Sequence, residues 1–253
     1  MTPVSGSRML IVVDTSLHQV SSSPTIFERI APRYDLANTV LSLGLHRRWK
    51  LALIRALEVN AGDVVLDAGT GTGDLAHLAA ARGARVIGVD MSAAMLAIAA
   101  QKAVRARPAP RVGRKIALLR GDLSRLPLAD GVASAVASAF VLRHLPDLGQ
   151  AFRELRRVLV PGGRIAVLEF GTPRPWIRPF YNAFSFWVIP TLGGRLTGDP
   201  RAYEFLVRSI RSFPEPAHVA AIMHAAGFAA VRRRPLSGGI AVLYTATTAG
   251  ASP

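Results

Sequence analysis

A short apolar run that leads directly into a glycine-rich loop restricts the fold of this chain more than any other feature. Residues 63–67 have the pattern of a buried strand, and a helical pattern begins at residue 74. Between them, glycine occupies alternate positions at Gly69, Gly71 and Gly73. Glycine adopts positive φ without strain and lets the backbone approach a ligand closely. This order predicts the start of a doubly wound parallel sheet, which binds ligands at the carboxyl ends of its strands.

The rest of the chain continues the alternation of strand and helix. The spacing predicts strands at 63–67, 85–90, 116–120, 132–140, 164–170, 228–234 and 240–246. Helices are expected at 74–82, 92–106, 147–159 and 217–226. The last two strands pair as an antiparallel hairpin, because only five residues separate them. We therefore expect an α/β fold with a doubly wound, seven-stranded, mostly parallel sheet, a C-terminal antiparallel hairpin and helical additions.

One domain accounts for most of the 253 residues, and we place it at 23–250. Residues 1–22 are rich in serine and lack sustained periodicity, so they are expected to be a flexible tail. A helical cap is predicted over 23–60, where proline and glycine divide the pattern into two or three helices. Residues 171–215 contain six prolines and interrupt the alternation, and we expect them to form a helical insertion over the sheet.

Composition excludes some functions and suggests a partner. The chain has no cysteine, which rules out disulfides, cysteine-ligated metals and a thiolate nucleophile, and we expect no metal site. Its 31 Lys and Arg against 16 Asp and Glu indicate a polyanionic neighbour, either nucleic acid or an anionic membrane surface. The early apolar run Met9–Val13 is too short for a transmembrane helix or a signal peptide, so a cytoplasmic protein is expected.

The charges around the glycine loop argue against a dinucleotide as the ligand. The third glycine of a dinucleotide fingerprint belongs at position 74, which is Asp74 here. A pyrophosphate seeks the N–H groups of a helix start and is repelled by carboxylates beside them. Asp67 and Asp74 instead suit a ligand with positive charge, such as an amino acid moiety that carries an ammonium and a sulfonium.

Two more carboxylates complete a binding pattern at the ends of successive strands. Asp90 ends the second strand and can accept two hydrogen bonds from a ribose diol, although it can also cap the helix near Ser92. Asp122 follows the third strand and can accept from an adenine amino group, with Leu123 packed on the ring. Together with the loop, these residues predict that the chain binds S-adenosylmethionine.

Several motifs give the sequence a family resemblance over residues 26–246. They are Tyr34–Asp35–Leu36–Ala37–Asn38, Gly71–Thr72–Gly73–Asp74, Pro161–Gly162–Gly163, Leu168–Glu169–Phe170 and Ser209–Ile210–Arg211–Ser212–Phe213–Pro214. The chain resembles the class I methyltransferases and, more narrowly, the C-methyltransferases of ubiquinone and menaquinone biosynthesis. The resemblance implies methylation of a ring carbon of a prenylated quinol.

The resemblance also implies which residues touch the cofactor. By motif match these are Thr72, Asp90, Asp122 and Leu123. The predicted cofactor site as a whole contains Asp67, Gly69, Gly71, Thr72, Asp90, Met91, Asp122 and Leu123.

One motif departs from the family pattern. Where the family has Phe–Gly–x–Arg–Asn, this chain has Phe140–Val141–Leu142–Arg143–His144. The changes to Val141 and His144 narrow or alter the space beside the transferred methyl, so the acceptor is either the quinol or another small aromatic compound.

Ring methylation needs the acceptor hydroxyl to lose a proton, and two predicted catalytic residues bear on that step. The guanidinium of Arg143 keeps its proton at neutral pH, so it cannot act as a base. It can, however, stabilise the developing oxyanion. His144 is either the general base or an imidazole bonded to backbone beside a helix.

Four residues are expected at the substrate. Tyr34 and Asn38 lie on one helical turn and either close over the site or merely cap and pack. Tyr181 and Tyr203 either hydrogen-bond the substrate or pack in the core.

Two segments suggest a lipid environment. The aromatic stretch 176–187 is either a helix packed on the sheet or an apolar wall for an isoprenoid tail reached from the bilayer. The basic stretch 102–120 is either a solvated face or a contact with an anionic leaflet. We expect a lipophilic quinol as the partner, a peripheral position at the membrane and no nucleic acid, since no RNA-binding module is recognisable. The oligomeric state stays open, with a homodimer among the alternatives.

Overall fold

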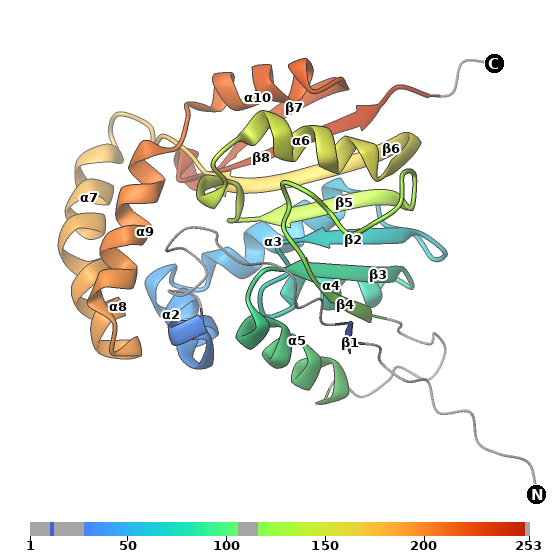
Figure 1. The fold of residues 1–253 in the computed structure, drawn as a ribbon. Helices are drawn as coiled ribbons and strands as arrows, with labels where there is room; N and C mark the ends of the chain where they lie inside the picture. The colour runs from blue at the N-terminus through green and yellow to red at the C-terminus, as the bar shows by residue number, and fades with distance from the viewer. Residues whose placement is uncertain (1–10, 13–27, 106–115, 251–253) are drawn as a thin grey trace, which may run out of the picture.

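The computed structural model describes residues 11–12, 28–105 and 116–250 (Figure 1). Within them the chain forms one sheet with the strand order β1-β4-β3-β2-β5-β6-β8-β7. Its strands are β1 (Ile11–Val12), β2 (Val64–Ala68), β3 (Arg85–Asp90), β4 (Ile116–Arg120), β5 (Ala133–Ala139), β6 (Leu159–Phe170), β7 (Phe228–Leu236) and β8 (Ala241–Thr248). Only β8 runs antiparallel to its neighbours, β6 and β7. The predicted fold class and the C-terminal hairpin are therefore confirmed.

The strand β1 lies in the segment that was expected to be a flexible tail. Ile11 pairs with Leu118 and Val12 with Leu119, so this short strand extends the parallel sheet beyond β4. The prediction is wrong at these two residues. The rest of residues 1–22 lies outside the described part of the chain.

Helices connect and cover the strands. They are α2 (Tyr34–Leu41), α3 (Leu45–Ala56), α4 (Asp74–Ala80), α5 (Ala93–Arg105), α6 (Leu148–Arg157), α7 (Arg178–Ala183), α8 (Ile189–Thr197), α9 (Pro200–Ser212) and α10 (Pro216–Ala225). Short helical turns add η1 (Ala31–Arg33), η2 (Leu142–His144), η3 (Phe184–Val188) and η4 (Ser237–Gly239).

The two faces of the sheet have separate cores because side chains alternate along each strand. In β2, Leu66 belongs to the cluster formed with α6 and α10, whereas Val65 belongs to the cluster formed with α3 and α4. The central strands are buried on both sides, which explains their apolar sequences.

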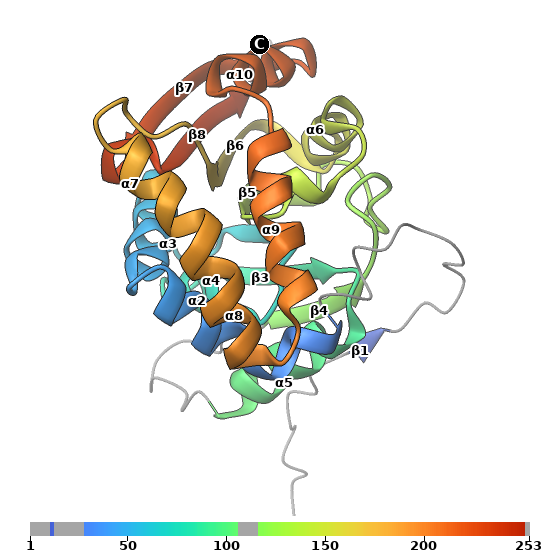
Figure 2. The same ribbon diagram turned by 90° about the vertical axis from the view of Figure 1, so that its left-hand side faces the viewer.

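The helical insertion stands beyond the carboxyl edge of the strands rather than over a face of the sheet (Figures 1 and 2). Helices α8 and α9 pack there against α2 through buried side chains that include Leu41, Ile189 and Tyr203. None of the helices in the described ranges is long and apolar enough to span a bilayer.

A glycine–aspartate–proline turn sets the sharp angle between α8 and α9. Gly198 ends α8 with φ 79°, a conformation that favours glycine. Asp199 then caps α9 by accepting from the Ala202 N–H at 3.3 Å, and Pro200 occupies the first helical position, where it needs no N–H partner. The two helices pack closely, because a Cβ on Gly193 would lie 2.5 Å from the ring of Tyr203.

We expect Gly193→Ala to lower the free energy of unfolding by about 1–2 kcal/mol, because overpacking against Tyr203 outweighs the gain of about 1 kcal/mol in helix propensity. Urea denaturation measures this change. Gly250→Ala is the control and should change nothing, since no atom lies within 4 Å of the added Cβ. An equally stable Gly193→Ala would contradict the close packing.

Candidate active site

A cavity of about 500 Å³ lies at the carboxyl edge of the sheet. Its floor is built by the glycine loop and by the ends of β3, β4, β5 and β6, and its roof by α2, α3 and the helical insertion. The volume falls in the usual range for small-molecule sites. The fold thus places one cavity where a doubly wound sheet is expected to bind its ligand.

Most of the predicted cofactor residues meet in this cavity. Those that line it are Gly69, Gly71, Thr72, Asp90, Met91, Asp122 and Leu123. They come from the loop after β2 and from the ends of β3 and β4, so parallel strands bring together residues that are distant in the sequence.

The glycines of the loop have different surroundings. Gly71 has φ 53°, and a Cβ there would meet no atom of the described residues within 4 Å apart from its chain neighbours, so this part of the chain leaves the backbone open at Gly71. Gly69 has φ 73°, and its Cβ would lie 2.8 Å from Cγ1 of Val141. The loop is therefore open to a ligand at Gly71 and packed against the end of β5 at Gly69.

Asp67 does not line the cavity, and the prediction that it touches the cofactor is corrected. It is buried beneath the loop, where its Oδ2 accepts from the Thr70 hydroxyl at 2.7 Å and from the Ala76 N–H at 2.9 Å. Burial raises its pKa to about 6. Asp67 therefore supports the loop and the start of α4 from below.

Asp90 holds the loop and still offers acceptors to a ligand. Its Oδ2 accepts from the Gly71 N–H at 2.8 Å and its Oδ1 from the Ser92 N–H at 2.9 Å. Each carboxylate oxygen has a second lone pair, which leaves room for the two hydroxyls of a ribose. The helix cap is Ser92, whose hydroxyl accepts from the Met95 N–H at 3.2 Å.

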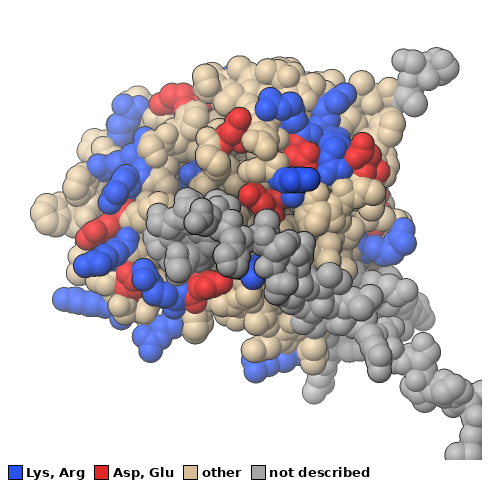
Figure 3. Space-filling model, viewed as in Figure 1, with Lys and Arg blue, Asp and Glu red and all other residues tan. Residues whose placement is uncertain are grey.

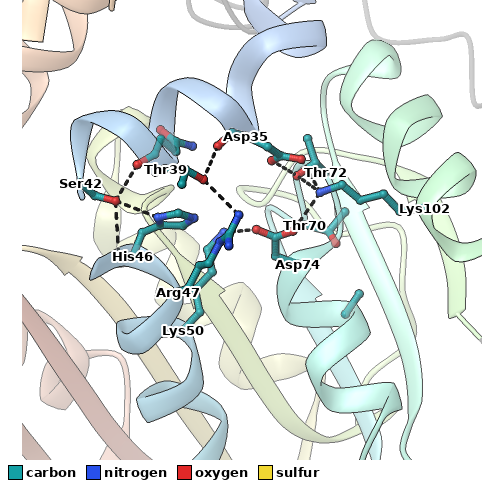
Figure 4. Close-up of polar contacts among 12 residues, drawn as sticks. Asp35, Thr39, Ser42, His46, Arg47, Lys50, Thr70, Thr72, Asp74 and Lys102 are labelled. Carbon is teal, nitrogen blue, oxygen red and sulfur yellow. Dashed lines mark hydrogen bonds and ion pairs between the residues drawn. The ribbon is translucent and has the colours of Figure 1, made fainter. Parts of the chain in front are cut away.

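Asp74 does not line the cavity, and two lysines hold its carboxylate. Lys50 contacts its Oδ2 at 2.8 Å and Lys102 its Oδ1 at 2.9 Å (Figure 4). Although burial alone would raise it, these two ammonium groups hold the pKa of Asp74 well below its usual range. Lys102 also contacts Asp35 of α2 and donates to the Thr72 hydroxyl at 3.0 Å. The network ties α2 to the glycine loop and α5.

Arg143 lies at the opposite end of the floor, after β5. Its Nη1 contacts Oε1 of Glu169 at 2.8 Å, and both side chains are buried. The guanidinium carbon lies 5.1 Å from the centroid of the Phe170 ring and 5.9 Å from that of Phe140. Arg143 also lines the cavity, so a fixed cation faces the space beyond the predicted cofactor residues.

His144 lines the same part of the cavity and stacks on Phe205 of α9, with ring centroids 5.6 Å apart. Burial, followed by the charge of Arg143, lowers its pKa to about 2. The imidazole is therefore neutral at pH 7 but is a weak base. The two roles that the sequence left open for His144, general base or imidazole bonded to backbone, stay predictions.

All four predicted substrate residues line the cavity. Tyr34 and Asn38 come from α2, Tyr181 from α7 and Tyr203 from α9. Burial raises the pKa of Tyr181 above its usual value and that of Tyr203 to about 12. Both hydroxyls are protonated at neutral pH and can donate hydrogen bonds.

Sequence reasoning missed several residues of the site. Trp49 lines the cavity, and its Nε1 donates to the Ser237 hydroxyl at 2.9 Å. Phe205 and Leu206 of α9 also line it, although nothing in their spacing identifies them. Glu169 had a usable signal, because a carboxylate inside the apolar strand β6 needs a partner.

These surroundings fit the cofactor that the sequence predicted. Gly71 leaves space for a ligand, and Asp90 and Asp122 offer carboxylates at the ends of neighbouring strands. The loop lacks the fingerprint for a pyrophosphate. The fold and the site define an S-adenosylmethionine-dependent methyltransferase of class I.

Comparison with known proteins gives the family. The model of the ubiE/COQ5 methyltransferase family matches residues 15–248, and the chain belongs to this family. It is 44% identical over 227 residues to a ubiquinone/menaquinone biosynthesis C-methyltransferase of Rubrivivax gelatinosus, covering 90% of this chain and 87% of that protein. It is 41% identical over 233 residues to a demethylmenaquinone methyltransferase of Mycolicibacterium vanbaalenii, covering 92% and 96%.

A solved structure shares the fold at much lower identity. Phosphoethanolamine N-methyltransferase 2 of Haemonchus contortus, in complex with S-adenosyl-L-methionine, superposes with a TM-score of 0.59 at 15% identity. The match covers 79% of this chain and 52% of that one.

Asp90→Ala should weaken S-adenosylmethionine binding about tenfold or more, because charge-assisted hydrogen bonds contribute about 1.5–3 kcal/mol. Isothermal titration calorimetry measures the dissociation constant. Asp130→Ala is a matched control, since this carboxylate is exposed and does not line the cavity. Unchanged affinity in a folded Asp90→Ala protein would remove Asp90 from the cofactor site.

His144→Asn should reduce the acid sensitivity of the fold. The unfolded imidazole binds a proton near pH 6.5 and the folded one only near pH 2, so His144 costs stability as the pH falls below 6.5. We expect wild type to lose up to about 1.4 kcal/mol per pH unit more than His144→Asn between pH 6 and 5. Urea denaturation at several pH values tests this, and equal slopes would contradict the lowered pKa.

Proposed function

We propose that this methyltransferase transfers the methyl group of S-adenosylmethionine to a ring carbon of a prenylated quinol. The observation that carries the proposal is the apolar and aromatic wall of the cavity beyond the cofactor residues. The names of the two curated relatives support a quinone acceptor.

This wall is built mainly by the roof of the cavity. Its members include Ile30, Leu41, Phe184, Ile189, Leu206 and Ile210. An isoprenoid tail can bury its surface against such side chains and gains about 25 cal/mol for each Å² removed from water. A small polar acceptor would leave most of this surface without a partner.

The polar groups of the wall fit the ring of a quinol. Arg143 lines the cavity with a guanidinium that can donate to a ring oxygen, and Tyr181 and Tyr203 add hydroxyl donors. When bound, S-adenosylmethionine supplies a methyl group already activated by the sulfonium. Arg143 then favours the oxyanion that makes the neighbouring ring carbon nucleophilic, while the apolar wall limits the water around the ring.

When bound, the cofactor would give its methyl group to the ring carbon and leave as S-adenosylhomocysteine. The proton from the acceptor hydroxyl would pass to water, and the proton on the methylated ring carbon would return to the ring oxygen, which restores the aromatic ring. Val141 narrows the acceptor space from the side of the glycine loop, because it packs against Gly69. This packing is the observation that keeps a smaller aromatic acceptor as the alternative.

We also propose that the enzyme works at a membrane surface, where its acceptor would reside. Large apolar side chains are exposed along the turn before α7, α7 itself and η3, namely Trp176, Phe180, Phe186, Trp187 and Val188. Phe180 is 78% exposed and also lines the cavity, so the apolar surface continues into the site. Arg211 lies over the ring of Phe186 at 4.2 Å and adds a cation beside this surface.

The described part of the basic stretch 102–120 leaves its two alternatives, a solvated face or a contact with an anionic leaflet, as predictions. Lys102 is occupied by Asp35 and Asp74, and Arg120 donates to the Met91 carbonyl at 3.0 Å. The residues between 106 and 115 lie outside the described part of the chain. On the face drawn in Figure 3, Lys and Arg are dispersed among Asp and Glu rather than gathered in one stripe.

Methyl transfer to a panel of demethylated quinols tests the function. We expect turnover with benzoquinols or naphthoquinols and a higher kcat/KM for long isoprenoid tails than for short ones, with products identified by mass. Small phenols without a tail provide the comparison. Faster methylation of these phenols than of every quinol would replace the proposal with the alternative acceptor.

Trp187→Ser and Phe186→Ser should weaken binding to anionic phospholipid vesicles several-fold, because each removes an aromatic side chain that would enter the interface. Co-sedimentation with vesicles measures the bound fraction. Val104→Ser is the control, since Val104 is 76% exposed on α5, away from this surface. Equal loss in the control, or no loss in either aromatic variant, would contradict a membrane contact at α7 and η3.

A further inference from the structure

Arg143, which the proposed function uses, forms a buried ion pair with Glu169, and Glu169 has no role in that function. The side chain of Arg143 is 3% exposed and that of Glu169 is fully buried. Such a pair is costly to desolvate, and replacing it with apolar residues is often neutral or stabilising. Stability therefore does not explain why this ion pair lies at the edge of the cavity.

Glu169 binds both the side chain and the backbone of Arg143. Its Oε1 accepts from Nη1 of the Arg143 side chain at 2.8 Å, and its Oε2 accepts from the Arg143 backbone N–H at 3.3 Å. Oε1 also accepts from the Phe170 N–H at 2.9 Å, which fixes the carboxylate to its own strand. The contacts join the turn after β5 to the end of β6.

The rest of the guanidinium is left available. Nε of Arg143 is buried and has no hydrogen-bond partner among the described residues. Rings of Phe140 and Phe170 lie beside the guanidinium and supply no strong acceptor. Since Arg143 lines the cavity, an oxygen of a bound acceptor can approach the part of the guanidinium that borders it.

Glu169 itself does not line the cavity, so it acts only through Arg143. The carboxylate of Glu169, at 2.8 Å, offsets the charge of the Arg143 guanidinium. Before the reaction, the neutral hydroxyl of the acceptor therefore lies beside an ion pair with no net charge. As the hydroxyl loses its proton, the directed N–H groups of Arg143 meet a growing negative charge, and such donors are most effective when held in place beforehand.

We propose that Glu169 is a positioning residue, which fixes the Arg143 guanidinium toward the oxygen of the acceptor. The inference rests on the proposed methyl transfer to an aromatic ring. It assigns Glu169 an effect on the methyl-transfer step and none on cofactor binding.

The test compares Glu169→Gln, Glu169→Asp, Arg143→Gln and the double variant Arg143→Gln/Glu169→Gln in steady-state kinetics. Gln keeps the shape of the side chain but not its charge, so kcat should fall about tenfold or more, while KM for the acceptor changes less than about threefold. The dissociation constant for S-adenosylmethionine should stay at the wild-type value in each folded variant. Glu169→Asp keeps the charge and should recover part of the loss.

The double variant shows whether Glu169 acts by positioning Arg143 or contributes to catalysis independently of it. If Glu169 acts through Arg143, the double variant should have the same kcat as Arg143→Gln alone, because nothing remains to be positioned. If Glu169→Gln fails to fold, Glu169→Asp and the double variant still give this comparison. Asp63→Asn is the matched control, since it breaks the ion pair with Arg164 at 3.0 Å at the start of β2, and it should keep the wild-type kcat.

Wild-type kcat in folded Glu169→Gln or Glu169→Asp, or additive losses in the double variant, would overturn the positioning role. Failure of the proposed function looks different, because the wild-type enzyme would then methylate no quinol at all. In that case the same series is measured with whichever aromatic acceptor is methylated.

Discussion

Two carboxylates support the glycine loop at the cofactor end of the cavity: Asp67, which is buried beneath the loop, and Asp90, which also lines the cavity. Asp67 binds the loop and the start of α4 through Thr70 and Ala76, and Asp90 binds the loop through the Gly71 N–H. Both carboxylates come from the ends of neighbouring parallel strands, so the register of β2 and β3 fixes the distance between them. The open space at Gly71 depends on this support, since a loop without it would lose the positive φ angles that keep the backbone exposed.

The acceptor end of the cavity depends on packed helices as well as on the sheet. Its floor belongs to the sheet, but its roof is the layer of α2, α8 and α9 held together by side chains such as Leu41, Ile189 and Tyr203. Polar contacts tie this layer to the core at the Asp35–Lys102 ion pair (Figure 4). The class of the enzyme is thus a property of the sheet, whereas the choice of acceptor depends on helices that pack on its edge.

The sequence predicted the sheet well because alternation and turn residues are local signals. It also pointed to Asp90, Asp122 and Leu123, which parallel strands bring together in the cavity; their contacts with the cofactor stay predictions. It could not show the surroundings of Asp67 and Asp74, since the sequence shows a carboxylate beside the loop but not the partners that occupy it. The chemistry of His144 was equally hidden, because the stacking partner that helps to bury it, Phe205, is distant in the chain.

The contact between Val141 and Gly69 links two positions that the family motifs treat as independent. With valine at 141, its methyl groups occupy the volume that any side chain at 69 would need. Position 69 therefore needs glycine for two reasons. Its φ angle is positive, and the side chain of Val141 occupies the space that a Cβ would need. Alanine or serine at position 69 would therefore require a smaller residue at position 141 as well.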